Sequence, residues 1–291
     1  MRLVILGYGY TARRFFSRLP RPEHATLTVR DPARAEALTR RGITGLAFDG
    51  TARVPALSAA LRSATHVLSS IPPQGGVDPV LACHGEDLAA APDLQWIGYL
   101  TTTGVYGHRD GAWVDETTPL SPTNARSLAR VTAETEWQAL GATTDTPTGI
   151  FRLAGIYGPG RNAFVKLADG TAHRIVKPGQ VFNRIHVDDI GRVLGAAVAQ
   201  TAGGLFDVAD GHPSPPQDVV TFAASLMGVA PPPEEPFETA ALSPMARSFY
   251  ATCCRVRGRR IRDVLGVSLA FPDYRAGLGA LWRDDNWRGD S

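Results

Sequence analysis

Short apolar runs alternate with longer segments of mixed polarity through the first two thirds of the chain. The run at 1–6 is followed by residues 11–19, whose apolar spacing suits a helix, and Pro20 ends that helix because proline cannot continue it. Alternation of this kind predicts a parallel sheet with helices on both faces. The further predicted strands are 26–30, 45–48, 66–71, 95–100, 149–153 and 204–208, and the further helices are 32–42, 57–63, 79–90 and 125–140.

The first strand runs directly into the sequence GYGYTA at residues 7–12. Gly7 can adopt a tight turn, Gly9 lets the backbone approach a pyrophosphate, and Ala12 lets the next helix pack close to the strand. The free N–H groups and the positive dipole end of that helix would then face the phosphates. Because a strand precedes the motif and a helix follows it, we predict a dinucleotide-binding turn rather than an ordinary glycine-rich turn. The residues expected to contact the cofactor here are Gly7, Gly9, Tyr10, Thr11 and Ala12.

Arg30 and Asp31 follow the second strand. In dinucleotide-binding proteins the residues at this position determine the specificity for NAD or NADP. A carboxylate there binds the ribose hydroxyls and favours NAD, whereas an arginine suits the 2′-phosphate of NADP. Asp31 and Pro32 also fit the N-cap and first position of a helix. We therefore expect Arg30 to bind NADP, and NAD is the alternative.

The carboxyl ends of the other strands are expected to complete the cofactor site, because ligands of parallel sheets bind there. Asp49 and Gly50 are placed to contact adenine, although a plain turn explains them equally well. Hydroxyl groups, backbone groups and rigid prolines follow the fourth strand. The expected contacts from these ends are Asp49, Gly50, Ser70, Ile71, Pro72, Thr101 and Leu153.

Four motifs, at 7–12, 101–107, 151–160 and 184–190, together resemble the extended and atypical short-chain dehydrogenase/reductase family, which includes NAD-dependent epimerases and dehydratases. The likeness covers most of the chain and weakens towards the carboxyl terminus. It implies an α/β fold: a Rossmann-type, doubly wound parallel sheet with a small C-terminal substrate-binding cap.

The resemblance also implies a division of the chain. The dinucleotide-binding domain would span 1–155 and would be completed by about 184–210. The cap would comprise 156–183 and 211–291.

The chain departs from the family at the residues that move a proton. The family's Ser or Thr, which hydrogen-bonds the reacting oxygen, corresponds to Thr102. The family's Tyr-x-x-x-Lys pair corresponds to Arg126 and Arg130, so the spacing on one helix face survives but the residue types change. An arginine has a pKa above about 12, so its neutral form costs at least roughly 7 kcal/mol at neutral pH. Arg126 is therefore excluded as an efficient proton donor or acceptor.

Other roles remain open for these residues. Arg126 can stabilise negative charge on a substrate, and Arg130 can hold the cofactor ribose as the family's Lys does. Both arginines can equally be solvated residues of a helix surface. The proton would then come through water or from Tyr106, which the family retains in a pocket-lining segment. The expected catalytic set is Thr102, Tyr106, Arg126 and Arg130.

A second group of polar residues lies where the family binds its substrate. Arg161 follows a glycine-proline turn and suits an anionic group, and Arg152 belongs to the same expected cluster. Surface charge is the alternative explanation. The expected substrate contacts are Arg161, Asn162, Arg184 and His186.

The composition of the chain limits which classes of protein and which partners remain to be considered. The 291 residues are 44% hydrophobic and 20% charged, with a net charge of +2, so we expect a globular protein with no nucleic-acid partner. No apolar run approaches the length of a membrane span, and the three cysteines form no disulfide framework and no metal-ligand spacing. We expect a cytoplasmic protein without a metal, and Leu128, Val131 and Leu140 would suit either a homodimer interface or the sheet.

Two functions follow from these observations. The first is an NAD(P)-dependent oxidoreductase or epimerase-like enzyme with an atypical active site, acting on a small, anionic substrate. The second is a non-catalytic protein that senses NADP(H), since the binding motif is kept and the acid/base residue is not.

Overall fold

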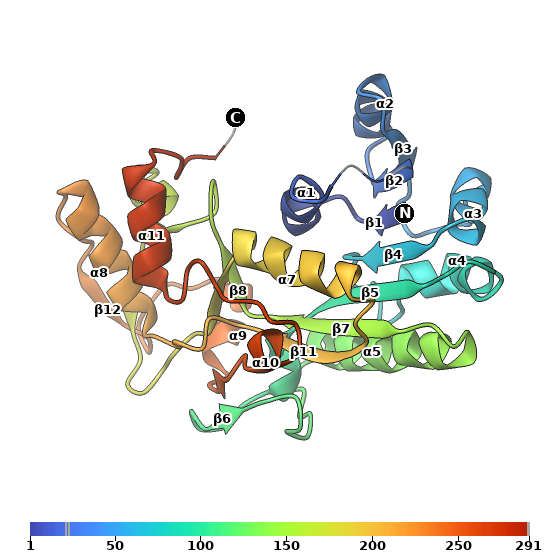
Figure 1. The fold of residues 1–291 in the computed structure, drawn as a ribbon. Coiled ribbons are helices and arrows are strands. Elements are labelled where there is room, and N and C mark those ends of the chain that lie inside the picture. The colour runs from blue at the N-terminus through green and yellow to red at the C-terminus, as the bar shows by residue number, and fades with distance from the viewer. Residues whose placement is uncertain (21, 23, 290–291) are drawn as a thin grey trace.

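The computed structural model describes residues 1–20, 22 and 24–289. Its core is one parallel sheet with the strand order β11-β7-β5-β4-β1-β2-β3 (Figure 1). This order reverses direction at β1 and β4, as in a doubly wound nucleotide-binding fold. The strands are β1 (Arg2–Leu6), β2 (His24–Val29), β3 (Thr44–Ala47), β4 (His66–Ser69), β5 (Trp96–Thr102), β7 (Thr148–Leu153) and β11 (Gly204–Val208).

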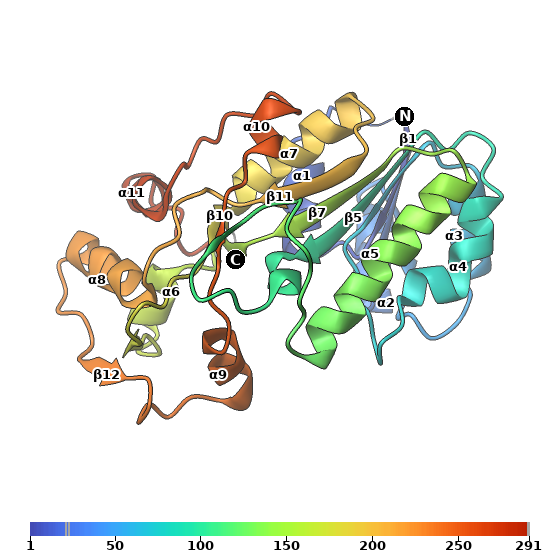
Figure 2. The same ribbon diagram turned by 90° about the horizontal axis from the view of Figure 1, so that it is seen from below.

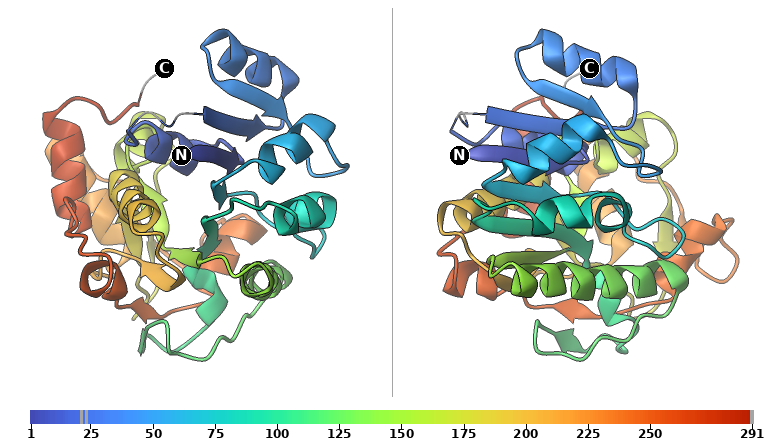
Figure 3. Two further views of the ribbon diagram at one scale, coloured as in Figure 1. Left: turned by 45° about the vertical axis from the view of Figure 1, so that its right-hand side comes forward. Right: turned by 90° about the vertical axis from the view of Figure 1, so that its right-hand side faces the viewer.

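Helices cover both faces of the sheet, as Figures 2 and 3 show. On one face lie α1 (Tyr10–Phe16) and α7 (Val187–Ala199), and on the other lie α3 (Pro55–Arg62), α4 (Pro79–Ala89) and α5 (Ala125–Thr143). Successive strand residues alternate between these two layers, because side chains of a strand point to opposite faces. In β1, for example, Leu3 and Ile5 join the first layer, and Val4 and Leu6 join the second.

The expected fold class and all of the predicted strands are confirmed, with small shifts at their ends. Asp31 caps α2 (Pro32–Arg40) by accepting the Ala33 N–H at 2.9 Å, as its sequence position predicted. β5 runs on to Thr102, beyond the predicted end at residue 100, because it stays paired with β7 as far as Leu153.

The remaining elements lie mainly beside the carboxyl ends of the central strands, where Figure 1 shows α8 and α11. Three short parallel pairs, β8 with β10, β9 with β12 and β6 with β13, connect distant parts of the chain. Their bounds are β6 (Trp113–Val114), β8 (Gly155–Tyr157), β9 (Arg174–Val176), β10 (Arg184–His186), β12 (Glu234–Pro236) and β13 (Arg255–Val256). The helices are η1 (Thr103–Tyr106), α6 (Ala163–Ala168), α8 (Pro216–Met227), α9 (Pro244–Tyr250), α10 (Arg260–Asp263) and α11 (Tyr274–Arg283).

A separate apolar cluster holds α6, α8 and α11 together. Phe164, Ala223 and Leu278 are buried in it, and Tyr157 joins it from β8. This packing places α11 against the end of the sheet that carries the expected site. Within the described residues, no helix is both long and apolar enough to cross a bilayer.

Candidate functional site

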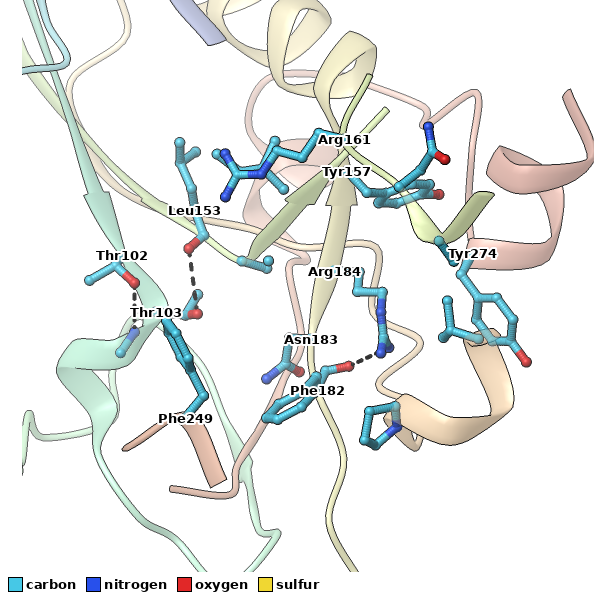
Figure 4. A pocket seen from close by; sticks show the side chains of 18 of the residues that line it. Thr102, Thr103, Leu153, Tyr157, Arg161, Phe182, Asn183, Arg184, Phe249 and Tyr274 are labelled. Carbon is cyan, nitrogen blue, oxygen red and sulfur yellow. Dashed lines mark hydrogen bonds between the residues drawn. The ribbon is translucent and has the colours of Figure 1, made fainter. Parts of the chain in front are cut away.

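A cavity of about 1090 Å³ opens at the carboxyl ends of the central strands and continues between α8, α9 and α11 (Figure 4). Its size is at the upper end of small-molecule pockets. It is the place where the sheet's strand order reverses, as expected for a cofactor site. The expected site residues that line it are Gly9, Tyr10, Thr11, Ser70, Thr101, Thr102, Arg130, Leu153, Arg161, Asn162 and Arg184.

The glycine-rich turn has the geometry that its sequence predicted. Gly7 has φ of +87°, and a Cβ there would lie 2.8 Å from Cγ1 of Ile71, so a larger residue would be strained and would clash. The hydroxyl of Ser70 donates to the Gly7 carbonyl at 2.5 Å and holds the turn. A Cβ on Gly9, in contrast, would meet nothing within 4 Å, so the surface above Gly9 is open for a phosphate group.

Several other expected cofactor residues do not line the cavity. Arg30 is exposed directly after β2. Asp49 accepts the Thr51 N–H at 2.9 Å and its hydroxyl at 2.8 Å, which forms a turn and lowers the pKa of Asp49. The residues in this group are Gly7, Ala12, Arg30, Asp49, Gly50, Ile71 and Pro72.

Thr101 and Thr102, at the end of β5, both line the cavity. The Thr101 hydroxyl is buried and has no hydrogen-bond partner among the described residues. The Thr102 oxygen accepts the Gly104 N–H at 3.1 Å, so its own proton is left to donate to a ligand. The Thr102 proton and the open surface over Gly9 therefore fit a polar ligand at this end of the cavity.

The two arginines of α5 have different surroundings. Arg130 lines the cavity and donates from Nη1 to the Leu100 carbonyl at 2.9 Å, which fixes it against β5. Arg126 is exposed and does not line the cavity, and its guanidinium carbon lies 5.4 Å from the ring centre of Phe249 in α9. The structure therefore brings Arg130, and not Arg126, to the other expected cofactor contacts.

Tyr106 is buried outside the cavity, contrary to the expectation that it would face a substrate. Its hydroxyl lies 2.9 Å from both oxygens of Asp207 and accepts a hydrogen bond from Nη1 of Arg152, also at 2.9 Å. Burial raises the pKa of Tyr106. Arg152 is likewise buried and pairs with Glu134 at 2.7 Å, so neither residue is available to a substrate.

Some of the expected substrate residues line the cavity and others do not. His186 is buried outside the cavity, where Nδ1 accepts the Asp188 N–H and caps α7; burial lowers the pKa of His186 to about 4. The Asn162 side chain lines the cavity, but its amide donates to the Gly158 and Trp287 carbonyls and its oxygen caps α6. Arg161 and Arg184 reach the cavity with cationic groups, as expected.

Sequence reasoning missed the apolar side of this cavity. Phe182, Phe249, Tyr250 and Tyr274 line it from segments far apart in the chain. Their spacing in sequence carries no signal, because only the packing of α9 and α11 brings them together. Lys166 and His173 add to the polar lining, and no Asp or Glu of the described residues lines the cavity. The described residues also contain no cluster of three His, Cys, Asp or Glu side chains arranged for a metal.

Comparison with solved structures agrees with this geometry. A dTDP-glucose 4,6-dehydratase from Streptomyces venezuelae, solved with NAD, is 18% identical with a TM-score of 0.74, covering 98% of both chains. The human epimerase family protein SDR39U1, solved with NADPH, is 17% identical with a TM-score of 0.72, covering 97% of this chain and 99% of that one. The chain thus shares the Rossmann-type fold of these two proteins, which confirms the fold that the sequence resemblance implied.

A nearer likeness defines the family. A conserved protein of unknown function from Silicibacter pomeroyi is 48% identical over 97% of this chain and 98% of its own, with a TM-score of 0.86. The chain belongs to the same family as that protein. A curated relative, 3-diazoavenalumate denitrifying reductase from a Streptomyces species, is 31% identical over 164 residues. The match covers 52% of this chain and 52% of the relative, so the chain spans about half the length of the relative that it matches. No protein-family model matches the chain.

Proposed function

We propose that the protein is an NAD(P)-dependent oxidoreductase that binds its cofactor along the glycine-rich turn and the ends of β4 and β5. The observation that carries this proposal is the open surface over Gly9, which shares one cavity with Thr102 and with Arg130. A pyrophosphate would fit over Gly9 at the N-terminus of α1. Arg130, held against β5 by the Leu100 carbonyl, would bind a ribose hydroxyl with its other N–H groups.

The chemistry at this site would depend on hydrogen bonding rather than on a tyrosine acid. A nicotinamide bound there would supply or accept a hydride. Thr102 would donate its proton in a hydrogen bond to the reacting group and would orient it. Four tyrosines line the cavity, namely Tyr10, Tyr157, Tyr250 and Tyr274. Tyr10 and Tyr157 donate to the Pro159 and Asp273 carbonyls, and burial raises the pKa of all four tyrosines, to about 12 for Tyr10. We therefore propose that water supplies any proton that the reaction needs.

Two further assignments follow the same reasoning. The reductase name of the curated relative favours net reduction of the substrate over epimerisation. Arg30, exposed after β2 and with Asp31 occupied as a helix cap, would favour NADP over NAD. The cavity walls from α8, α9 and α11 would bind the substrate, in keeping with a substrate-binding cap over 156–183 and 211–291.

The cofactor site is tested by titrating NADPH and NADH while following nucleotide fluorescence. Gly9→Val should weaken binding at least about tenfold, because the side chain would fill the phosphate cradle. Gly85→Val is the matched control, since Gly85 of α4 also has open space around it but lies away from the cavity. Unchanged affinity in Gly9→Val, or no binding of either nucleotide to the unaltered protein, would refute the proposal.

The missing tyrosine acid favours a second candidate, a protein that binds NADP(H) without turnover. NADPH deuterated at C4, incubated with a panel of carbonyl compounds and other electrophiles, separates the two. Deuterium recovered in a product supports the oxidoreductase. Tight NADPH binding with no deuterium transfer across the panel supports the sensor.

A further inference from the structure

The part of the cavity away from the glycine-rich turn has aromatic walls. Phe182 precedes β10, Phe249 and Tyr250 end α9, and Tyr274 begins α11. In Figure 4, Phe182 and Tyr274 flank Arg184, and Phe249 extends on the side of Thr102 and Thr103. Such walls favour a flat apolar ligand body, because aromatic rings stack on flat groups and bury large areas.

Arg184 is the charged group within these walls. Its Nη1 donates to the Phe182 carbonyl at 3.0 Å, to the Ser214 carbonyl at 3.2 Å and to the Ser214 hydroxyl at 2.6 Å. Those are all the hydrogen bonds of this guanidinium within the described part of the chain, so Nε and Nη2 remain for a ligand. The guanidinium carbon of Arg184 lies 5.9 Å from the centre of the Tyr274 ring.

No counter-ion in contact with Arg184 is present among the described residues. The carboxyl that acts on it most strongly, Asp210, forms no ion pair with it, and burial raises the pKa of Asp210 to about 7, so its charge is incomplete at neutral pH. Burial also lowers the pKa of Arg184. A half-buried guanidinium that lacks a paired carboxylate is stabilised by an incoming anion.

Three of the polar groups in this cavity that could bind a carbohydrate are occupied by the protein itself. The Asn183 amide donates to the Cys254 carbonyl and its oxygen accepts the Val256 N–H. The Asn162 amide and the Tyr157 hydroxyl are likewise bonded within the protein. These three groups would therefore not replace the hydrogen bonds that a sugar's hydroxyls lose to water on binding.

We propose that the substrate is an amphipathic carboxylate with a flat, aromatic or conjugated body, whose carboxylate pairs with Nε and Nη2 of Arg184 while its body lies between Phe182, Phe249 and Tyr274. This deepens the proposed function, since the other end of the same ligand would meet Thr102 and the nicotinamide.

The test uses the NADPH-loaded full chain and three probes, measured by calorimetry. trans-Cinnamate carries the proposed carboxylate and flat body, trans-cinnamamide has the same body without charge, and UDP-glucose represents a sugar nucleotide. Cinnamate should bind at least about tenfold more tightly than the amide, because only the acid pairs with the guanidinium. Equal affinities for acid and amide, or tighter binding of UDP-glucose, would overturn the proposal.

Substitutions test whether the carboxylate of the probe binds at Arg184. Arg184→Gln should remove most of the preference for acid over amide, and Phe249→Ala should weaken both probes, because it removes one wall. Arg275→Gln is the matched control: its guanidinium lies 4.7 Å from the same Tyr274 ring but does not line the cavity, so the preference should persist. If Arg184→Gln does not fold, the proposed substrate class is still tested by Phe249→Ala and by the acid–amide comparison on the unaltered protein. NADPH binding is recorded separately. Failure of the unaltered protein to bind NADPH would refute the proposed function, whereas NADPH binding without a preference for acid over amide in the unaltered protein would refute only this inference.

Discussion

The Tyr106 hydroxyl and the Asp207 carboxyl form a buried contact, with 2.9 Å between the hydroxyl oxygen and each carboxyl oxygen. Arg152 donates to the same hydroxyl and pairs with Glu134, so four polar side chains form one network between η1, α5, β7 and β11. This network accounts for Tyr106 without any contact with a substrate. It places the tyrosine among groups that stabilise the sheet.

Tyr106→Phe should lower the free energy of unfolding by about 1–3 kcal/mol, because Asp207 and Arg152 each lose a buried partner. Chemical denaturation measures this loss. The affinity for NADPH, and turnover once a substrate is known, should change by less than about twofold per folded molecule, well under 1 kcal/mol. A loss of turnover with unchanged stability would restore Tyr106 as the proton donor.

Asp207 should make stability depend on pH. Burial raises its pKa to about 8, so the folded protein keeps a proton that the unfolded chain releases above its ordinary pKa of 3.8. The free energy of unfolding contributed by Asp207 therefore falls as the pH rises from about 4 to about 8, by at most about 1.4 kcal/mol per pH unit. Asn cannot titrate, so the Asp207→Asn variant lacks this pH dependence. Its free energy of unfolding, relative to that of the unaltered protein, should therefore increase as the pH rises.

Urea unfolding at several pH values between 4 and 8 measures this difference. Asp169→Asn, at an exposed position after α6, is the control and should follow the unaltered protein. A constant difference between Asp207→Asn and the unaltered protein across this range would show that Asp207 is ionised when folded.

Two glycines of α11 should respond oppositely to alanine. A Cβ at Gly277 would lie 2.0 Å from the Tyr157 hydroxyl oxygen, whereas a Cβ at Gly279 meets nothing within 4 Å. Gly277→Ala should destabilise the protein by about 1–3 kcal/mol through overpacking, and Gly279→Ala should stabilise it by roughly 0.5–1 kcal/mol. Thermal unfolding of the two variants provides the comparison, and equal effects would contradict the packing of α11 against β8.

Arg30→Ser should weaken NADPH binding by about tenfold or more while leaving NADH binding nearly unchanged, because it removes the partner proposed for the 2′-phosphate. Arg40→Ser serves as the control, since Arg40 is an exposed arginine of α2 that pairs with Glu36. Fluorescence titration with both nucleotides measures the ratio of affinities. The same ratio in Arg30→Ser and the unaltered protein would remove Arg30 from the cofactor site.

Arg130→Ala should weaken binding of both nucleotides more than Arg126→Ala does. Both residues lie on α5, but only Arg130 lines the cavity and is fixed against β5. The expected loss for Arg130→Ala is about 1.5–3 kcal/mol, the usual value of a hydrogen bond to a charged group. An equal loss in Arg126→Ala would indicate that the contact of Arg126 with Phe249 supports the site indirectly.

The local features of the fold were readable from the sequence alone. The strand that ends at Leu6 and the cap at Asp31 depend on neighbours within a few residues, so their patterns carried the information. The turn at Gly7 was predictable for the same reason, because its positive φ requires glycine wherever the turn occurs.

Only the tertiary structure decided which polar residues reach the cavity. Tyr106 and Asp207 are 101 positions apart, and their contact turns an expected proton donor into a buried partner of a carboxyl. The aromatic walls around Arg184 likewise come from segments that meet only after α9 packs beside β9, and α11 beside α8 and β10. Local sequence determined the strands, caps and glycine-rich turn because those depend on nearby backbone geometry, whereas the aromatic walls of the cavity depend on long-range packing that no local pattern records.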